Sequence, residues 1–170
     1  MYAVMIAVIM FSILLVTSLI APPTTPTSTY SGANNVAVTT TLDPATNQAK
    51  ALAWNMYEYH GAAEMYADAN PGHVGVIPTS ALSLPTGFVV TGPWTSYQTS
   101  SGVVTWADGN LDGSVTYGML ATALERVMGT TDEVGVATST NTVMSPCCGA
   151  VLNIPSGPTI AGGATVIVPQ

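Results

Sequence analysis

Hydrophobic and polar positions divide the chain into three parts. Residues 1–21 are almost entirely apolar, residues 22–42 are rich in Thr, Pro and Ser, and residues 43–170 mix apolar and polar positions. Wound as an α-helix, the first part is roughly 30 Å long, which is the thickness of the hydrocarbon core of a bilayer. We therefore expect a transmembrane anchor at 1–21, a flexible linker at 22–42 and one folded domain at 43–170.

The apolar segment has a second interpretation, a signal peptide that is removed. A cleavable signal has a basic amino-terminal region and ends in a small-x-small site. Here Leu19 stands two residues before Ala21, and Pro22 follows it. Both features disfavour cleavage after Ala21, so an uncleaved anchor is the preferred interpretation.

The first periodic segment of the domain predicts a long helix. The residues DP at 43–44 suit a helix start and NPG at 70–72 suits a helix end. Between them, apolar residues recur at steps of three and four and define one face, with Trp54 and Tyr57 off it. This face is expected to pack on the core, with a groove for a partner helix as the alternative, and it consists of Leu52, Met56, Tyr59, Ala63 and Tyr66.

The remainder of the domain predicts short strands and a second helix. The helix is expected from about Val115 to Met128, with Gly129 as its carboxy-terminal cap. Apolar pieces separated by Gly, Pro and Ser predict strands at 87–91, 95–99, 103–107, 133–138, 142–144, 150–154 and 164–168. The expected fold class is α+β, with two helices packed against an antiparallel sheet.

Charge excludes one large class of partners. The 170-residue chain has a net charge of −7, and Lys50 and Arg126 are its two basic side chains. This balance argues against binding to nucleic acid and to anionic lipid surfaces. Lys50 lies too far from the apolar segment to set its orientation in a membrane. The scarcity of Lys and the abundance of Thr, Ser, Asn and Gly favour a periplasmic domain.

One segment resembles part of a calcium loop. In DGNLDGSV, Asp108, Asn110 and Asp112 match the first, third and fifth positions of an EF-hand loop. The twelfth position, where a bidentate Glu closes the coordination shell, is Met119. A Gly-rich turn before the second helix is the other interpretation. Calcium is thus the one cofactor that the sequence leaves open.

The two cysteines are neighbours, Cys147 and Cys148. A disulfide between them would be strained, because a trans peptide holds the Cα atoms about 3.8 Å apart, below the usual disulfide range. Bridges to another chain and two reduced thiols are the alternatives. Without a C-x-x-C pattern, a thioredoxin-like role is not expected.

Catalytic signals are weak throughout the sequence. His60 and Glu64 share one helix face and His73 follows the helix, but no H-E-x-x-H pattern is present. A surface or capping histidine is therefore preferred to a metal ligand. The sequence also lacks a G-x-S-x-G elbow and a phosphate-binding lysine loop, so we expect a protein that is not an enzyme.

Five short pieces follow one another in a specific order between Ala51 and Pro169: YADANPGHVGVIPTSALSLPTGF, GPWTSY, GVVTWA, VGVA and VMSPCCGAVLNIPSGPTIAGGATVIVP. In this order they resemble the PilM family of type IVb (thin) pilus biogenesis proteins, found in conjugative plasmids and genomic islands. The segment DGNLDGSVTYG and the long Thr/Pro linker depart from the family pattern.

The resemblance implies a non-enzymatic protein of the bacterial inner membrane with a single transmembrane helix and a carboxy-terminal domain in the periplasm. It implies a scaffold role in pilus assembly, with other pilus assembly proteins or pilin as partners. A homo-oligomer is left open. Exposed aromatic residues suit such contacts, and Trp94 is the candidate, whereas Trp106 is expected in the core. For Trp94 itself, however, a position as a second core tryptophan is the preferred interpretation.

Two other functions remain open at this point. A type IV pilin or minor pilin also joins an apolar helix to an α+β head, but pilins usually carry a glutamate near the mature start, and here the fifth residue is Met5. No basic leader ending in glycine precedes the apolar run. A calcium-dependent adhesin or binding module rests on Asp108, Asn110 and Asp112 alone.

Overall fold

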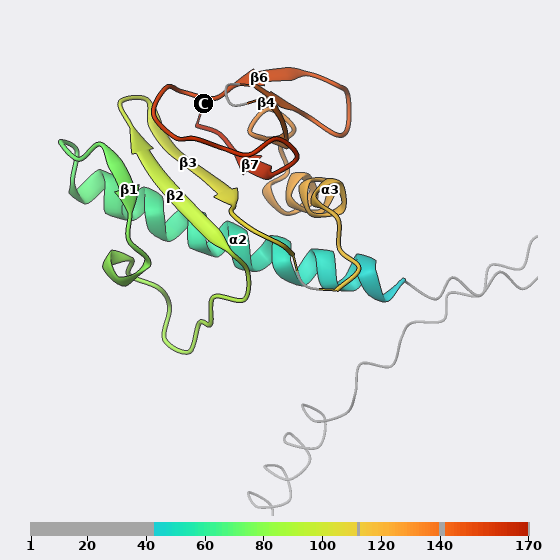
Figure 1. Cartoon of the computed structure of the whole chain (residues 1–170). Coiled ribbons are helices and arrows are strands. Elements are labelled where there is room, and N and C mark those ends of the chain that lie inside the picture. The colour runs from blue at the N-terminus through green and yellow to red at the C-terminus, as the bar shows by residue number, and fades with distance from the viewer. Residues whose placement is uncertain (1–42, 112, 140–141, 170) are drawn as a thin grey trace, which may run out of the picture. The chain divides into compact units, whose positions relative to one another are not determined.

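The architecture is an antiparallel sheet with helices on one face (Figure 1). The computed structural model describes residues 43–111, 113–139 and 142–169. In chain order this part contains α2 (Pro44–Ala69), β1 (Gly75–Ile77), the 3-10 turn η1 (Thr79–Ala81), β2 (Trp94–Thr99), β3 (Gly102–Ala107), α3 (Tyr117–Met128), β4 (Val134–Ser139), β5 (Thr142–Met144), β6 (Val151–Asn153) and β7 (Thr165–Ile167).

Local chemistry fixes where each helix begins and ends. The carboxylate of Asp43 accepts a hydrogen bond from the Ala45 N–H at 3.3 Å, which caps the start of α2. The hydroxyl of Thr116 does the same for α3. Gly129 ends α3 in the left-handed conformation, with φ of 71°, which glycine adopts without a steric penalty. The predicted starts and stops are thus confirmed, except that α3 begins two residues after Val115.

The sheet is held together by the last strand of the chain. The strand order is β1-β2-β3-β7-β4-β5-β6, and all neighbours are antiparallel. Strand β7 places Val166 opposite Trp106 of β3 on one side and opposite Gly135 of β4 on the other. The residues near the carboxy terminus therefore join two groups of strands that are separate in sequence.

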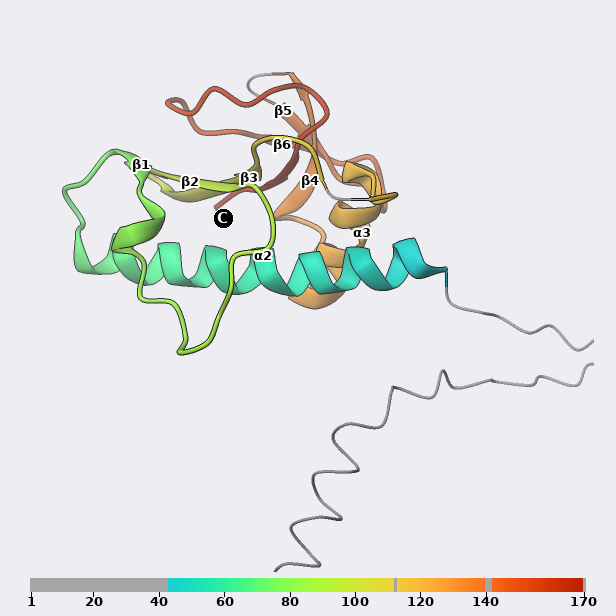
Figure 2. The same cartoon turned by 60° about the horizontal axis from the view of Figure 1, so that its bottom comes forward.

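The main core lies between the helices and one face of the sheet. Helix α2 contacts β2 and β3, whereas α3 contacts β4 and β7, and the two helices contact each other. Figure 2 shows both helices on the same side of the strands. The predicted apolar face of α2 is confirmed: Leu52, Met56, Tyr59 and Ala63 are buried, and Tyr66 is half-buried.

A second core covers the opposite face of the sheet. Successive residues of β3 point to opposite faces, so Val103 joins the helix-side core while Val104 and Trp106 join the second one. Ile154 and Ile160, from the segment between β6 and β7, complete that second core. The central strands are consequently buried on both faces.

The α+β prediction is confirmed, with two local differences. Residues 87–91 form no strand, because the Val89 carbonyl and the Thr91 N–H bond to the side chain of Asn55 instead of to a neighbouring strand. Strand β1 was not predicted, and it pairs with β2 through only three residues.

The structure leaves the membrane prediction open. Within residues 43–111, 113–139 and 142–169, none of the helices combines the length and the hydropathy that a bilayer crossing needs. The predicted anchor at 1–21 and linker at 22–42 lie outside the described residues.

A chain of polar side chains is buried between α2 and the sheet. The hydroxyl of Thr105 lies 2.8 Å from His60 Nδ1 and 2.7 Å from the hydroxyl of Ser96. All three residues are buried. Each of them therefore depends on the others for its hydrogen bonds.

We predict that Thr105→Val destabilises the domain by about 2 kcal/mol, because it leaves the buried His60 Nδ1 and Ser96 hydroxyl without this partner. Chemical unfolding of the full chain measures the change. As a matched control, Ser96→Ala in the Thr105→Val background removes one of the two orphaned groups and restores part of the loss. Equal stability of wild type and Thr105→Val would contradict the account.

Candidate functional site

The structure describes two of the three residues predicted for a calcium site. Asp108 and Asn110 lie exposed in the connection between β3 and α3, and Asp112 lies outside the described residues. The connection has its own support, since the Tyr117 hydroxyl donates to the Gly109 carbonyl. Calcium binding here stays a prediction.

Trp94 is a core residue, so the interpretation as a second core tryptophan is confirmed and the side chain is not exposed for contact with a partner. Only 5% of Trp94 is exposed, and its indole N–H donates to Asn55 Oδ1 at 2.7 Å. The ring also lies against Gly92, where an added Cβ would come within 2.1 Å of it. Trp106 is buried as expected.

Asn55 of α2 forms hydrogen bonds with the long loop between η1 and β2. Its Oδ1 accepts from the Thr91 N–H at 3.0 Å as well as from Trp94, and its Nδ2 donates to the Val89 carbonyl at 2.8 Å. A second link joins the hydroxyls of Tyr59 and Thr79 at 2.9 Å. Figures 1 and 2 both show the chain between η1 and β2 extending past α2. This loop is therefore a fixed part of the surface around the helix.

Large apolar side chains line the outer face of α2, opposite the buried face. Trp54 is 54% exposed and Met65 is 58% exposed. Tyr57, which lies between them in the sequence, is 37% exposed. Trp54 and Tyr57 make an edge-to-face contact, with ring centroids 5.9 Å apart. We call the α2 outer surface the group formed by Trp54, Tyr57, Gly61, Met65 and Pro85.

The α2 outer surface contains a hollow of about 310 Å³. Gly61 lines the hollow, and an added Cβ there would meet nothing within 4 Å. A glycine inside a helix costs about 1 kcal/mol relative to alanine, and no contact within the described residues requires it here. Pro85 lines the hollow from the loop, and Glu58 and Glu64 line it from α2. The hollow can accept one apolar side chain of a partner molecule, with a Lys or Arg of the partner next to it.

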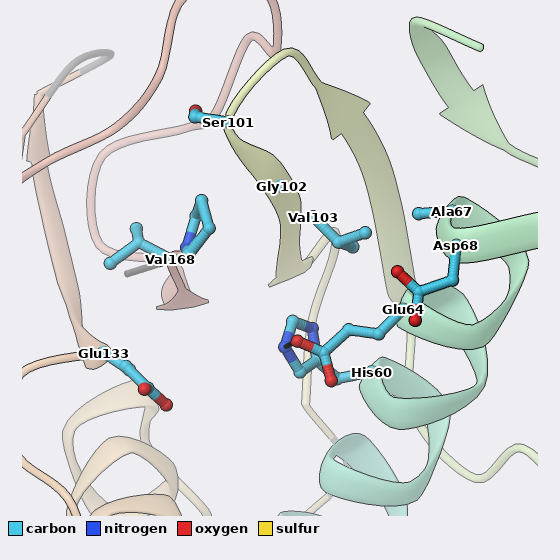
Figure 3. A pocket seen from close by; sticks show the side chains of 10 residues that line it. His60, Glu64, Ala67, Asp68, Ser101, Gly102, Val103, Glu133 and Val168 are labelled. Atoms are coloured by element: carbon cyan, nitrogen blue, oxygen red, sulfur yellow. Dashed lines mark ion pairs between the residues drawn. The ribbon is translucent and has the colours of Figure 1, made fainter. Parts of the chain in front are cut away.

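A second pocket, of about 390 Å³, opens between α2 and the sheet (Figure 3). His60, Glu64 and Asp68 line it from α2, and Glu133 faces them from the other side. Both ring nitrogens of His60 are engaged, Nδ1 with Thr105 and Nε2 with Glu64 Oε1 at 3.4 Å. The imidazole therefore has no free nitrogen with which to act on a bound molecule.

Metal binding in this pocket has no support. No group of three or more His, Cys, Asp or Glu residues that could hold a metal occurs in the part of the chain that the structure describes. His73 packs edge-to-face on Tyr66 and lies apart from the His60–Glu64 pair. The expectation of a surface or capping histidine was wrong for His60, which is buried between α2 and the sheet.

Cys147 and Cys148 are both exposed and both free in the turn between β5 and β6. Ser145, which is buried, lies within hydrogen-bonding distance of both sulfur atoms. The sequence alone could not reveal this serine or the buried Glu125 to which it donates, because α3 brings Glu125 from 20 residues earlier in the chain.

Comparison with solved structures identifies the class of fold. A crystal structure named as a PilM protein from Escherichia coli B7A superposes with a TM-score of 0.50 at 17% identity, covering 75% of this chain and 96% of that one. A structure named as a PilM protein from Pseudomonas aeruginosa 2192 is 27% identical with a TM-score of 0.39, covering 71% of this chain and 97% of that one. The first likeness shows a shared α+β fold.

A family model identifies the family to which the chain belongs. The PilM family model matches residues 27–168. The chain therefore belongs to the PilM family, as the short sequence pieces predicted. No curated protein matches the chain.

We predict a pH effect on stability from the His60–Glu64 pair. The hydrogen bond from His60 lowers the pKa of Glu64 from its ordinary value, against the opposing effect of burial. A lowered pKa means that Glu64 stabilises the fold above the unfolded pKa of about 4.3, and that this contribution is lost as the pH falls through the lower folded value.

Glu64→Gln should therefore lose less stability than wild type when unfolding is measured at a series of pH values from about 5 down to 3. The difference should be small, since the Glu64 side chain is 60% exposed. Parallel curves for the two proteins would show that the pair contributes nothing.

Proposed function

We propose that the protein is a non-enzymatic component of type IVb pilus assembly, anchored in the inner membrane through residues 1–21 and acting as a scaffold in the periplasm. Membership of the PilM family supplies the connection to pili. The observation that carries the scaffold role is the α2 outer surface, a group of exposed apolar side chains around a hollow on a rigid helix. Surfaces of this kind commonly bind other proteins.

The partner that fits this surface is another protein of the pilus assembly machinery, with an apolar side chain flanked by Lys or Arg. The hollow lies beside Glu58 and Glu64, and the chain as a whole has a net charge of −7. Opposite charges at the rim of an interface favour encounter and set the orientation of the partners. A second copy of this chain fits poorly, because Lys50 and Arg126 are its two basic residues.

Trp54→Ala is predicted to reduce the number of pili per cell at least about tenfold, because aromatic residues at the centre of an interface contribute most of its binding energy. Electron microscopy of cells that carry the variant measures this number. The melting temperature should change little, since the Trp54 side chain is largely exposed.

Two variants serve as controls for this experiment. Val89→Ala removes an exposed side chain outside the α2 outer surface and should leave pili unchanged. Trp94→Ala removes a core residue and should cost about 3–5 kcal/mol of stability. Normal piliation with Trp54→Ala would overturn the role of this surface.

Fractionation tests the proposed location and separates it from a filament subunit. We expect an immunoblot to find the full-length chain in the inner membrane and almost none in sheared extracellular filaments. Abundant protein in the filaments would identify a pilin or minor pilin instead. A shortened chain in the soluble periplasmic fraction would show that residues 1–21 are a signal peptide.

A further inference from the structure

The turn that carries the two cysteines is firmly held although both thiols are exposed. The Ser145 N–H donates to the Ala150 carbonyl at 2.9 Å, and the Gly149 N–H donates to the Ser145 carbonyl at 3.0 Å. These bonds close the turn between β5 and β6 around Cys147 and Cys148. The thiols are thus presented to solvent from a fixed backbone.

A buried carboxylate anchors this turn to α3. Glu125 is only 8% exposed, and its Oε1 accepts from the Ser145 hydroxyl at 2.6 Å and from the Cys147 N–H at 3.4 Å. Since the only hydroxyl proton of Ser145 is directed to Glu125, the Ser145 oxygen acts as an acceptor for the Cys148 thiol, 3.8 Å from its Sγ, and it lies 3.3 Å from Cys147 Sγ. A carboxyl group is therefore buried at the point that positions the cysteine pair.

The two thiols are not equivalent. The hydrogen bond from Cys147 and a second one from the Ala150 N–H lower the pKa of Cys148. The same bond between the thiols raises the pKa of Cys147, which acts as the donor. Cys148 is consequently the thiol that more readily becomes a thiolate, and the thiolate is the nucleophile in disulfide chemistry.

We propose that Cys148 is a thiol–disulfide exchange site that takes up disulfide-bearing molecules as mixed disulfides. The Cys148 thiol gives its proton to solvent, and the thiolate attacks one sulfur of the incoming disulfide. A new S–S bond forms at Cys148, the original S–S bond breaks, and the departing thiolate takes up a proton. The incoming disulfide is the oxidant, so no other reagent is needed.

The mixed disulfide should persist, because its neighbour cannot easily displace it. Attack by Cys147 would form a disulfide between adjacent residues, whose Cα atoms are about 3.8 Å apart across a trans peptide, below the usual range of about 4.4–6.8 Å. In the structure both cysteines are free. The site therefore suits covalent capture of a partner rather than rapid turnover as an oxidoreductase.

The test uses the reduced full chain and oxidised glutathione, with intact-mass spectrometry after acid quenching. Wild type is expected to gain one glutathione per chain. Cys148→Ser should lower the initial rate about tenfold, whereas Cys147→Ser, in which a hydroxyl can still donate to Cys148, should stay within about twofold of wild type. Circular dichroism checks that both variants are folded.

Two outcomes of this experiment overturn the proposal. One is a larger loss of rate with Cys147→Ser than with Cys148→Ser. The other is a wild-type chain that loses its glutathione and becomes two hydrogen atoms lighter than the reduced form, which would show that Cys147 resolves the adduct.

A second arm distinguishes the sources of the disulfide in cells. Cells are quenched with acid, their free thiols are blocked, and the chain is analysed without reductant. A reductant-sensitive band of higher mass that disappears with Cys148→Ser and remains with Cys147→Ser indicates a protein partner. An added mass of one small thiol at Cys148 indicates a low-molecular-weight disulfide. A wild-type chain without either adduct overturns the proposal.

Discussion

The close packing of α2 on strands β2 and β3 is the constraint on which the rest of the structure depends. Small residues of the helix, Ala49, Ala53 and Ala63, are buried in the core that α2 shares with the sheet and α3, and they allow α2 to pack closely there. The polar chain from His60 to Ser96 lies inside the same contact and is satisfied only when helix and strands are in register. Apolar burial supplies the stability of this contact, and the hydrogen bonds select one arrangement.

One face of α2 is buried in the core. The exposed aromatic residues on its other face therefore need a separate explanation. Asn55 holds the loop between η1 and β2 at the side of the helix, yet that loop leaves Trp54 and Tyr57 uncovered. Gly61 weakens the helix without relieving any contact among the described residues. Exposed aromatics beside such a glycine are better explained by a partner than by the stability of the domain alone.

Sequence reasoning recovered the regular elements and missed what depends on distant contacts. The ends of α2 could be predicted because Asp43 and Asn70 act within one helical turn. The order of the strands could not, because β7 is inserted between β3 and β4 by packing on both faces. The strand predicted at 87–91 and the exposed contact considered for Trp94 failed for one shared reason: both bond to Asn55, whose side chain is more than 30 residues away in sequence.

The two candidate sites lie on different elements, and this bears on how the domain could work as a scaffold. The α2 outer surface is supported by the contact of α2 with the sheet, whereas the cysteine turn is supported by Glu125 of α3. Reversible apolar contact and covalent capture can therefore act independently, since neither supporting contact includes a residue of the other site. A partner bound weakly through α2 would remain close to the chain, and proximity of this kind raises the effective concentration of any disulfide it carries near Cys148. Two modest sites on one rigid domain can in this way hold a partner more firmly than either site alone.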